Sequence, residues 1–192
     1  MDAHGLIAAC ATGSEERAAR RAGFRTARVG VCARRGVPAG EIVSFGVAGG
    51  LDGLAIGTVV DATRVVDETG AVLWEGEGLG RGRPGTILAI DRLIDDPAEL
   101  RRLREVTGAD AVDMESGVLA ATGRLRGCIR AISDSPQEPL GPVAKLVTPD
   151  GRLRASGLLA LARQPAAAAR ALVNIRCALR ALSSASAEGG SA

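Results

Sequence analysis

The sequence has few of the residues on which several kinds of binding site depend. Aromatic residues make up 2% of the 192 residues, so we expect no nucleic-acid surface built on stacked bases. The four cysteines form no CxxC pair and His4 is the single histidine, so we expect no metal site and reduced, mostly buried thiols. Lys145 is the single lysine, and the net charge of +2 gives no argument for nucleic acid as a partner.

Long apolar runs and targeting signals are also missing from the sequence. No apolar run reaches the ~18 residues that a membrane span needs, and no N-terminal stretch has the order of a signal peptide. We therefore expect a cytoplasmic protein. The length fits one domain, which we place at residues 1–182, and the Ser/Gly/Ala-rich stretch 183–192 is expected to be a disordered tail.

Short apolar strands alternate with helical segments along the chain. The strands are expected at residues 6–10, 27–32, 41–46, 57–66, 72–74, 86–90 and 127–132, and the helices from Ser14 and at 97–106, 117–122, 158–163 and 166–182. Residues 48–50 are expected to form a tight turn, and residues 76–85 a mobile loop. The alternation predicts an α/β fold, a three-layer sandwich with a central mixed, mostly parallel sheet flanked by helices.

Several charged residues follow strands at the ends where ligands bind in open α/β sheets. Glu15 and Glu16 follow the first strand, Asp134 follows the strand that carries Arg130, and Glu115 opens a helix. Each acid alone has a simpler explanation, because acids at helix starts usually serve as caps. Arg130 is more suggestive, because a charge inside an apolar strand is costly unless an anion or a carboxylate pairs with it.

Three motifs occur in a specific order, at residues 45–51 (FGVAGGL), 112–116 (VDMES) and 129–134 (IRAISD). In order and separation they resemble the purine nucleoside phosphorylase and nucleosidase superfamily. With its Arg/Ala/Leu-rich C-terminal segment, the chain is most similar to the hopanoid-biosynthesis-associated phosphorylases. The resemblance implies an enzyme that cleaves the N-glycosidic bond of an adenine nucleoside and releases adenine, by phosphorolysis of adenosyl-hopane in hopanoid lipid biosynthesis.

The resemblance also implies a role for each matching residue. Asp134, oriented by Ser133, would donate a proton to N7 of the leaving purine, so its carboxyl group must be protonated near neutral pH. Glu115 would accept hydrogen bonds from the ribose hydroxyls and face the cationic sugar of the transition state. Further substrate contacts are implied for Ala48, Gly49, Leu93, Ile94 and Met114.

The nucleophile side leaves alternatives open. Arg130 would hold phosphate or orient water, and Glu16, or Glu15 one residue earlier, matches the glutamate that nucleosidases use on water. Val47 replaces the hydroxyl residue usual before the Ala-Gly-Gly stretch, and residues 26–40 are too short for the usual helical crossover. We expect no cofactor, with phosphate as a co-substrate. The alternatives are a hydrolytic methylthioadenosine or S-adenosylhomocysteine nucleosidase and a non-catalytic nucleoside-binding homologue.

The segment from residue 151 to residue 187 contains six arginines and no acidic residue. One interpretation is a helix that covers the sheet, with its arginines facing water. The other is a basic amphipathic helix that contacts the inner membrane peripherally, where the enzyme would meet a lipid-linked nucleoside. The resemblance further implies a homodimer or a higher homo-oligomer.

Overall fold

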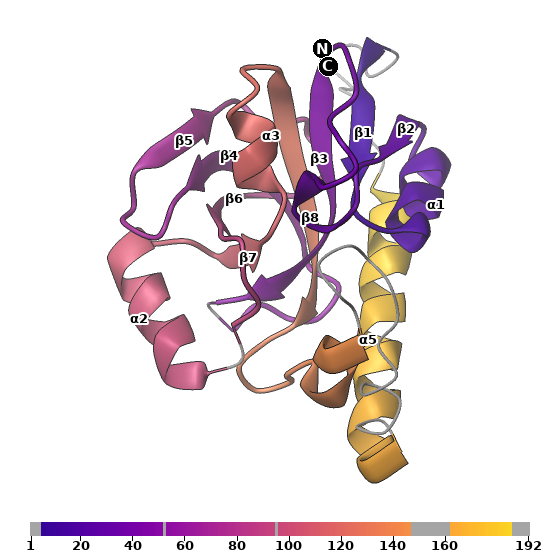
Figure 1. Ribbon diagram of the computed structural model, residues 1–192, viewed down its shortest axis with the longest axis vertical. Coiled ribbons are helices and arrows are strands. Elements are labelled where there is room, and N and C mark those ends of the chain that lie inside the picture. The colour runs from indigo at the N-terminus through magenta and orange to yellow at the C-terminus, as the bar shows by residue number, and fades with distance from the viewer. Residues whose placement is uncertain (1–4, 52, 95, 147–161, 186–192) are drawn as a thin grey trace, which may run out of the picture.

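A single mixed sheet of eight strands forms the centre of the computed structural model (Figure 1). The structure describes residues 5–51, 53–94, 96–146 and 162–185. The strand order is β2-β1-β3-β7-β6-β4-β5, and β8 pairs with both β3 and β4, so that β3, β7, β6, β4 and β8 form a closed ring. The strands are β1 (Ile7–Cys10), β2 (Arg25–Arg28), β3 (Ile42–Gly50), β4 (Val59–Val66), β5 (Val72–Glu75), β6 (Arg83–Ala89), β7 (Ala111–Asp113) and β8 (Leu125–Asp134).

Helices flank the sheet, as the sequence predicted. They are α1 (Gly13–Arg21), α2 (Pro97–Thr107), α3 (Ser116–Ala120) and α5 (Pro165–Ser184), with short 3-10 turns η2 (Val31–Ala33) and η3 (Gly141–Leu146). In Figure 1, α1 lies next to β1 and β2, α5 lies beside α1 and packs on β8, and α2 lies beyond β7 at the other side of the molecule. Five of the eight strand pairings are parallel, which confirms the mixed, mostly parallel sheet.

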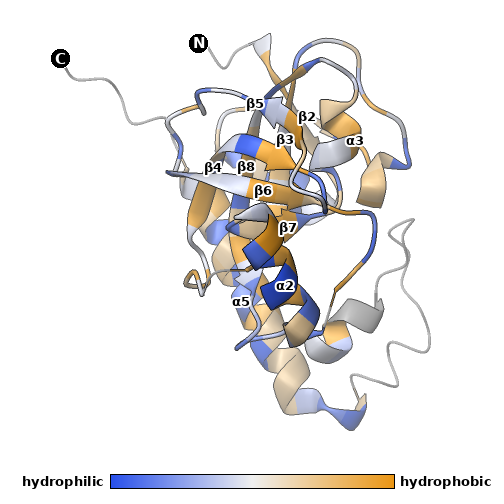
Figure 2. Ribbon diagram, turned by 90° about the vertical axis from the view of Figure 1, so that its left-hand side faces the viewer, coloured by the Kyte–Doolittle hydropathy of each residue, from blue (hydrophilic) through white to orange (hydrophobic). Residues whose placement is uncertain are grey.

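The alternation of side chains along β8 separates two faces of the sheet. Ile129 belongs to the buried cluster that contains Leu182 of α5. Cys128 points to the opposite face, into the cluster that contains Leu119 of α3. Arg130 shares the face of Cys128, so its fully buried side chain is directed toward α3. Figure 2 shows the hydrophobic residues concentrated on the strands at the middle of the molecule.

The tight turn expected at residues 48–50 is wrong, because these residues continue β3. Gly49 pairs with Val112 of β7 on one side and with Asp134 of β8 on the other. A β-carbon at Gly49 would lie 3.0 Å from Oδ2 of Asp134, so the glycine lets the carboxyl group lie against the strand. The Gly-Gly pair therefore serves close packing between strands rather than a change of direction.

The expected strand at residues 27–32 is also wrong in its second half. The strand ends at Arg28, and the chain then turns at Gly30, whose φ is +76°. Cys32 and Ala33 also have positive φ, both +52°, which no strand can contain. The short crossover at residues 26–40 is thus a compact turn and not a helix.

The remaining boundaries differ from the predictions by small amounts. Helix α1 begins at Gly13 and is capped by Thr12 rather than by Ser14, and α2 is capped by Asp96. Strand β6 starts at Arg83, inside the expected loop. The expected C-terminal helix is confirmed as α5, which extends to Ser184. Most of the expected helix at 158–163 and the tail from residue 186 lie outside the described residues. Within the described residues, no helix is long and apolar enough to cross a membrane.

Candidate active site

Asp134 ends β8 beside a small cavity. The cavity has a volume of about 90 Å³, and Gly49, Leu93 and Ile94 line it together with Asp134. The hydroxyl of Ser133 donates to Oδ1 of Asp134 at 2.6 Å, so the serine holds the carboxyl group as the sequence predicted. Residues 135–136 and 139–141 form the outer wall of the cavity.

The surroundings of Asp134 favour its protonated form. Burial raises the pKa of the Asp134 carboxyl, and the hydrogen bond from Ser133 opposes this shift without cancelling it. No cationic side chain forms an ion pair with this carboxyl among the described residues. A carboxylic acid in this position can donate a hydrogen bond or a proton to a ligand in the cavity.

Arg130 lies at the centre of a buried polar cluster on the α3 side of the sheet. Its side chain has no solvent exposure, and its Nη2 forms an ion pair with Asp113. The same atom donates to Oγ of Ser44 at 2.6 Å and lies 3.6 Å from Oε2 of Glu115. Burial would lower the pKa of Arg130, but the negative groups around it, led by Asp113 and joined by Glu115 and Glu15, together outweigh burial and raise the pKa, so the guanidinium stays charged.

Asp113, Ser116 and Ser44 were not assigned a role from the sequence. Ser116 donates to Asp113 through its hydroxyl and also through its backbone N–H, which lies 3.2 Å from Oδ2. The hydroxyls of Ser44 and Ser116 are 3.3 Å apart. Asp113 and Ser116 belong to the same five-residue motif as Glu115, and their place in that motif could have identified them as residues of the site. Ser44 lies in an ordinary apolar strand, and no feature of the sequence marks it as a residue of the site.

Glu115 lies at the edge of this cluster, 6% exposed. Its Oε1 accepts the backbone N–H of Cys32 at 3.1 Å, and its Oε2 faces Arg130. Burial raises the pKa of Glu115 to about 7, against the opposing effect of Arg130. A carboxylate that is close to half-ionised at neutral pH can accept hydrogen bonds from hydroxyl groups of a ligand.

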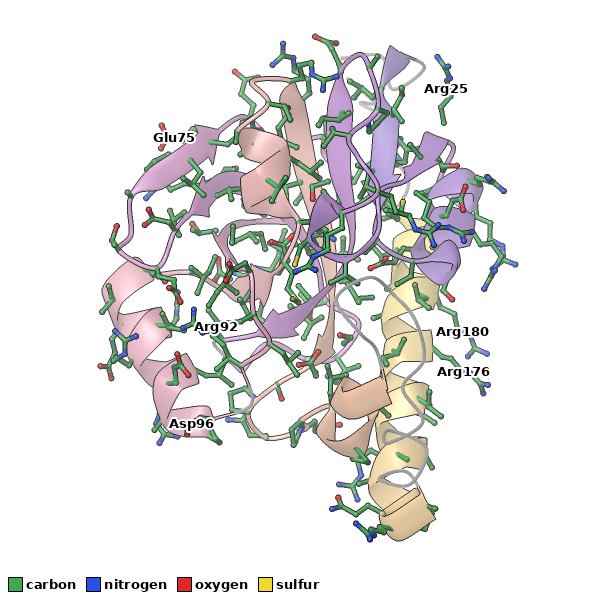
Figure 3. All side chains as sticks on the ribbon, in the orientation of Figure 1. Arg25, Glu75, Arg92, Asp96, Arg176 and Arg180 are labelled. Carbon is green, nitrogen blue, oxygen red and sulfur yellow. The ribbon has the colours of Figure 1, made fainter. Side chains whose placement is uncertain are left out.

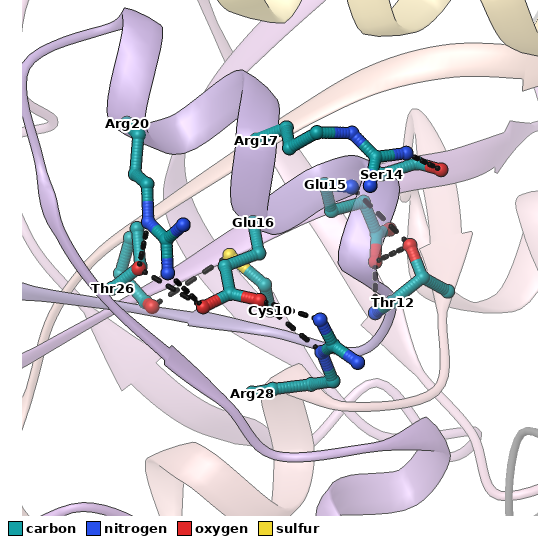
Figure 4. A network of polar contacts seen from close by, with 10 residues as sticks. Cys10, Thr12, Ser14, Glu15, Glu16, Arg17, Arg20, Thr26 and Arg28 are labelled. Carbon is teal, nitrogen blue, oxygen red and sulfur yellow. Dashed lines mark hydrogen bonds and ion pairs between the residues drawn. The ribbon is translucent and has the colours of Figure 1, made fainter.

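The structure separates the two N-terminal glutamates (Figure 4). Glu15 is 3% exposed and turns inward, where Oε1 accepts the N–H of Val47 at 2.9 Å. Glu16 turns outward between Arg20 and Arg28, and Nη2 of Arg28 lies 2.8 Å from its carboxylate. The hydrogen bond from Arg28 lowers the pKa of Glu16. Of the two alternatives left open by the sequence, the geometry favours Glu15 as the acid of the candidate site, whereas Glu16 is engaged by arginines at the surface.

Glu15 and Arg130 meet beside the backbone of Gly46. A β-carbon at Gly46 would collide with both Oε1 of Glu15 and Nη1 of Arg130, so these two atoms border the same small space. Nη1 and Nε of Arg130 are buried and have no hydrogen-bond partner within the described part of the chain. An unpaired buried donor is costly, so Nη1 and Nε of Arg130 are suited to donate to a polar atom of a ligand.

Two other residues expected to contact the substrate, Ala48 and Met114, do not line the cavity beside Asp134. The carbonyl of Ala48 accepts the Ser133 hydroxyl at 3.4 Å, so this buried residue supports the wall of the site. Met114 lines a separate hollow of about 360 Å³, and the structure does not bring it into the cavity of Asp134. Over the ranges that the structure describes, no group of three or more His, Cys, Asp or Glu side chains could hold a metal ion.

No protein-family model and no curated protein matches the sequence. Solved structures do match its fold. A 5′-methylthioadenosine/S-adenosylhomocysteine nucleosidase of Campylobacter jejuni is 16% identical, covers 94% of this chain and 99% of that chain, and has a TM-score of 0.56. The corresponding nucleosidase of Neisseria meningitidis, in complex with methylthio-immucillin-A, is 18% identical over 93% and 97% of the chains, with a TM-score of 0.57.

A futalosine hydrolase mutant of Helicobacter pylori is 15% identical, covers 69% of this chain and 91% of that chain, and has a TM-score of 0.55. These proteins differ in substrate but share one architecture. This protein therefore has the fold of the nucleosidases.

Proposed function

We propose that this protein hydrolyses the N-glycosidic bond of an adenine nucleoside and releases adenine. The main support for the proposal is the close approach of Oε1 of Glu15 and the unpaired Nη1 of Arg130 beside Gly46. A carboxylate and a guanidinium in this arrangement are suited to bind and activate one water molecule. Asp134 and Glu115 supply the other two groups that the reaction needs.

The leaving-group and sugar sides follow from the two carboxyl groups. Adenine leaves poorly as an anion, and protonation at N7 by Asp134 removes that charge as the bond from C1′ to N9 breaks. Glu115 accepts hydrogen bonds from the ribose hydroxyls, and its negative charge stabilises the cationic sugar. Leu93 and Ile94 provide an aliphatic wall for the base.

A water molecule is the nucleophile, and each of its atoms can be followed through the reaction. Water accepts a hydrogen bond from Nη1 of Arg130, and its oxygen attacks C1′ while Glu15 accepts its proton. Asp134 delivers its own proton to the purine. One water molecule is consumed, and the products are adenine and a free sugar.

The charges around Arg130 favour water over phosphate as the nucleophile. The carboxylates of Asp113, Glu15 and Glu115 surround a single guanidinium, so a phosphate anion would meet repulsion from more than one carboxylate. Val47 offers no hydroxyl, and its N–H is already bound to Glu15. We therefore propose hydrolysis in place of the phosphorolysis expected from the sequence resemblance.

The size of the cavity bears on how a substrate enters. Its volume of about 90 Å³ is below the ~300 Å³ at the lower end for ligand pockets. Leu93, which is 50% exposed, and residues 135–136 and 139–141 of the loop after β8 line the cavity. We infer that this loop moves outward when the base enters.

A lipid-linked nucleoside such as adenosyl-hopane is the second candidate substrate, and the outer face of α5 favours it. Leu172 and Val173 are 44% and 61% exposed there. Arg176 and Arg180 point away from the sheet on the same helix (Figure 3). Exposed apolar residues among arginines suit an anionic lipid surface.

A substrate panel in phosphate-free buffer tests the proposal. Adenosine, methylthioadenosine and an adenosine with a long apolar 5′ substituent are each incubated with the protein, and free adenine is measured. Release from methylthioadenosine supports the nucleosidase proposal, and preference for the apolar analogue supports the lipid-linked substrate. Binding without adenine release from any of them, with or without added phosphate, would mean a non-catalytic nucleoside-binding protein.

A further inference from the structure

The turn before β3 has an unusual backbone conformation. Cys32 and Ala33 both have φ of +52°, in the left-handed region that residues with a β-carbon rarely adopt. Gly30, with φ of +76°, starts the turn, and the N–H of Arg35 closes it by donating to the carbonyl of Val29 at 2.7 Å. Two consecutive left-handed residues persist only when their surroundings hold them, and such conformations cluster at functional sites.

The contacts of Cys32 show what this conformation achieves. The backbone N–H of Cys32 points at Oε1 of Glu115 and donates to it at 3.1 Å. The thiol donates to the carbonyl of Asp91, just after the end of β6, with the sulfur 3.8 Å from the oxygen. The turn is thus held between β6 and α3, with its N–H directed toward the carboxyl group that faces the sugar in our proposed function.

We propose that Cys32 is the residue that positions Glu115 for ribose binding, through the left-handed conformation that aims its N–H at Oε1. This inference rests on the proposed function, because it takes Glu115 as the ribose-binding group. Oε1 is held by Cys32 and Oε2 by the facing Arg130, 3.6 Å away, so both ends of the carboxyl group are fixed. The lone pairs that remain free then face the ligand in one orientation.

The charged groups around Glu115 explain why a single backbone N–H can affect the ionisation of its carboxyl group. Arg130 on β8 favours the ionised carboxyl, whereas Asp113 on β7 and Glu15 on α1 disfavour it, as does burial. The N–H of Cys32 is a second contact that favours the ionised form. Loss of this hydrogen bond should therefore raise the pKa of Glu115 above its present value of about 7 and leave the carboxyl mostly protonated at neutral pH.

Replacement of Cys32 by residues with different backbone preferences tests the inference. Valine is close to cysteine in size but β-branched, so Cys32→Val should move the backbone out of the left-handed region. Cys32→Gly accepts that region freely and keeps the N–H. Cys177→Val makes the same replacement on the exposed face of α5 and serves as the matched control.

The readouts are the pKa of Glu115, by ¹³C NMR titration of its side-chain carboxyl, and the KM and kcat for methylthioadenosine. We expect Cys32→Val to raise the pKa of Glu115 and to raise KM by about tenfold, with a smaller change in kcat. A tenfold change in affinity is the size expected for the loss of one hydrogen bond. Cys32→Gly should restore both values, and Cys177→Val should match the wild type. An unchanged pKa of Glu115 in a folded Cys32→Val variant would overturn the inference.

The two proposals fail in different ways. If the wild type releases no adenine, the proposed function fails, while the NMR titration still shows whether Cys32 controls Glu115. If the wild type releases adenine and the Cys32→Val variant keeps the wild-type KM and pKa, the function stands and the positioning role of Cys32 is wrong.

Discussion

At the level of single residues, Asp134 is the position where the proposed protonation of the leaving group can be tested separately from nucleoside binding. Its carboxyl group has Ser133 as a partner and a raised pKa caused by burial. Asparagine has the same shape and can still donate a hydrogen bond, but it cannot transfer a proton. Substitution of Asp134 by Asn therefore removes the proposed proton transfer and leaves the shape of the cavity unchanged.

We expect Asp134→Asn to lower the rate of adenine release by ~10²–10⁴, the range typical of general acid catalysis. Nucleoside binding, measured by calorimetry, should change little, because the side chain keeps its size. Ser133→Ala is the matched control and should lower the rate less, since Asp134 keeps its acidic proton. An Asp134→Asn variant with the wild-type rate would show that another group protonates the purine.

The sequence predicted some residues of the site and missed others for physical reasons. Asp134 and Ser133 were found because they end a clear apolar strand within a specific motif. Glu15 and Glu16 could not be separated, because the choice depends on where α1 begins. Thr12 caps the helix and turns Glu15 inward, with the Glu15 carboxylate accepting the backbone N–H of Thr12 at 2.7 Å.

Among the secondary-structure elements, β3 carries Gly46, which the proposed nucleophile site requires. Any β-carbon at Gly46 would collide with Glu15 and Arg130. We expect Gly46→Ala to reduce adenine release by at least about tenfold, because displacement of either group removes a contact worth about 1–3 kcal/mol.

The control for this prediction is Gly5→Ala, because nothing lies within 4 Å of a β-carbon at Gly5 and its φ is not positive. Circular dichroism and thermal unfolding would confirm that both variants fold. Wild-type activity in Gly46→Ala would mean that Glu15 and Arg130 do not act at this point.

The outer face of α5 gives a second prediction at this scale. The exposed Leu172 and Val173 among arginines should bind anionic vesicles at low salt, measured by co-sedimentation. Replacement of both by Asp should weaken binding and leave adenine release from methylthioadenosine unchanged. Neutral vesicles are the control, and no sedimentation of the wild type with anionic vesicles at low salt would end the membrane proposal.

The elements were predicted unequally well. The helix of residues 166–182 and the strand before Asp134 follow from local patterns of apolar residues. The course of β3 through Gly50 does not, because Gly49 is held there by two partners, β7 and β8, that are distant in the sequence. The left-handed turn at Cys32 and Ala33 is equally hidden, since neither residue type favours positive φ.

At the scale of the whole molecule, the closed ring of β3, β7, β6, β4 and β8 brings the site together. Strand β8 pairs with β3 in parallel and with β4 in antiparallel orientation, so Arg130 is enclosed by strands on both sides. Alternation of strands and helices predicted the α/β class, but this closure depends on pairings that no local pattern encodes.

Burial of Glu115 should make the stability of the whole protein depend on pH. The folded pKa of about 7 lies above the ordinary value of 4.5, so the folded state binds more protons between these pH values. Unfolding free energy should therefore fall as pH rises from about 5 to 7.5. At 1.36 kcal/mol per pKa unit, the contribution of Glu115 is on the order of 1–3 kcal/mol.

Urea denaturation at several pH values measures this effect, with Glu115→Gln as the comparison. Gln cannot titrate, so the variant should gain stability relative to the wild type as pH rises through 7. Parallel curves for the two proteins across this range would show that Glu115 is not protonated in the fold.

The identity of the sugar product tests the central claim most directly. Methylthioadenosine is incubated with the protein and an excess of phosphate, and the products are identified by mass spectrometry. We expect equal amounts of adenine and free methylthioribose, because in the proposed function Glu15 and Arg130 direct water to C1′. Methylthioribose 1-phosphate as the product, or no adenine at all, would contradict it.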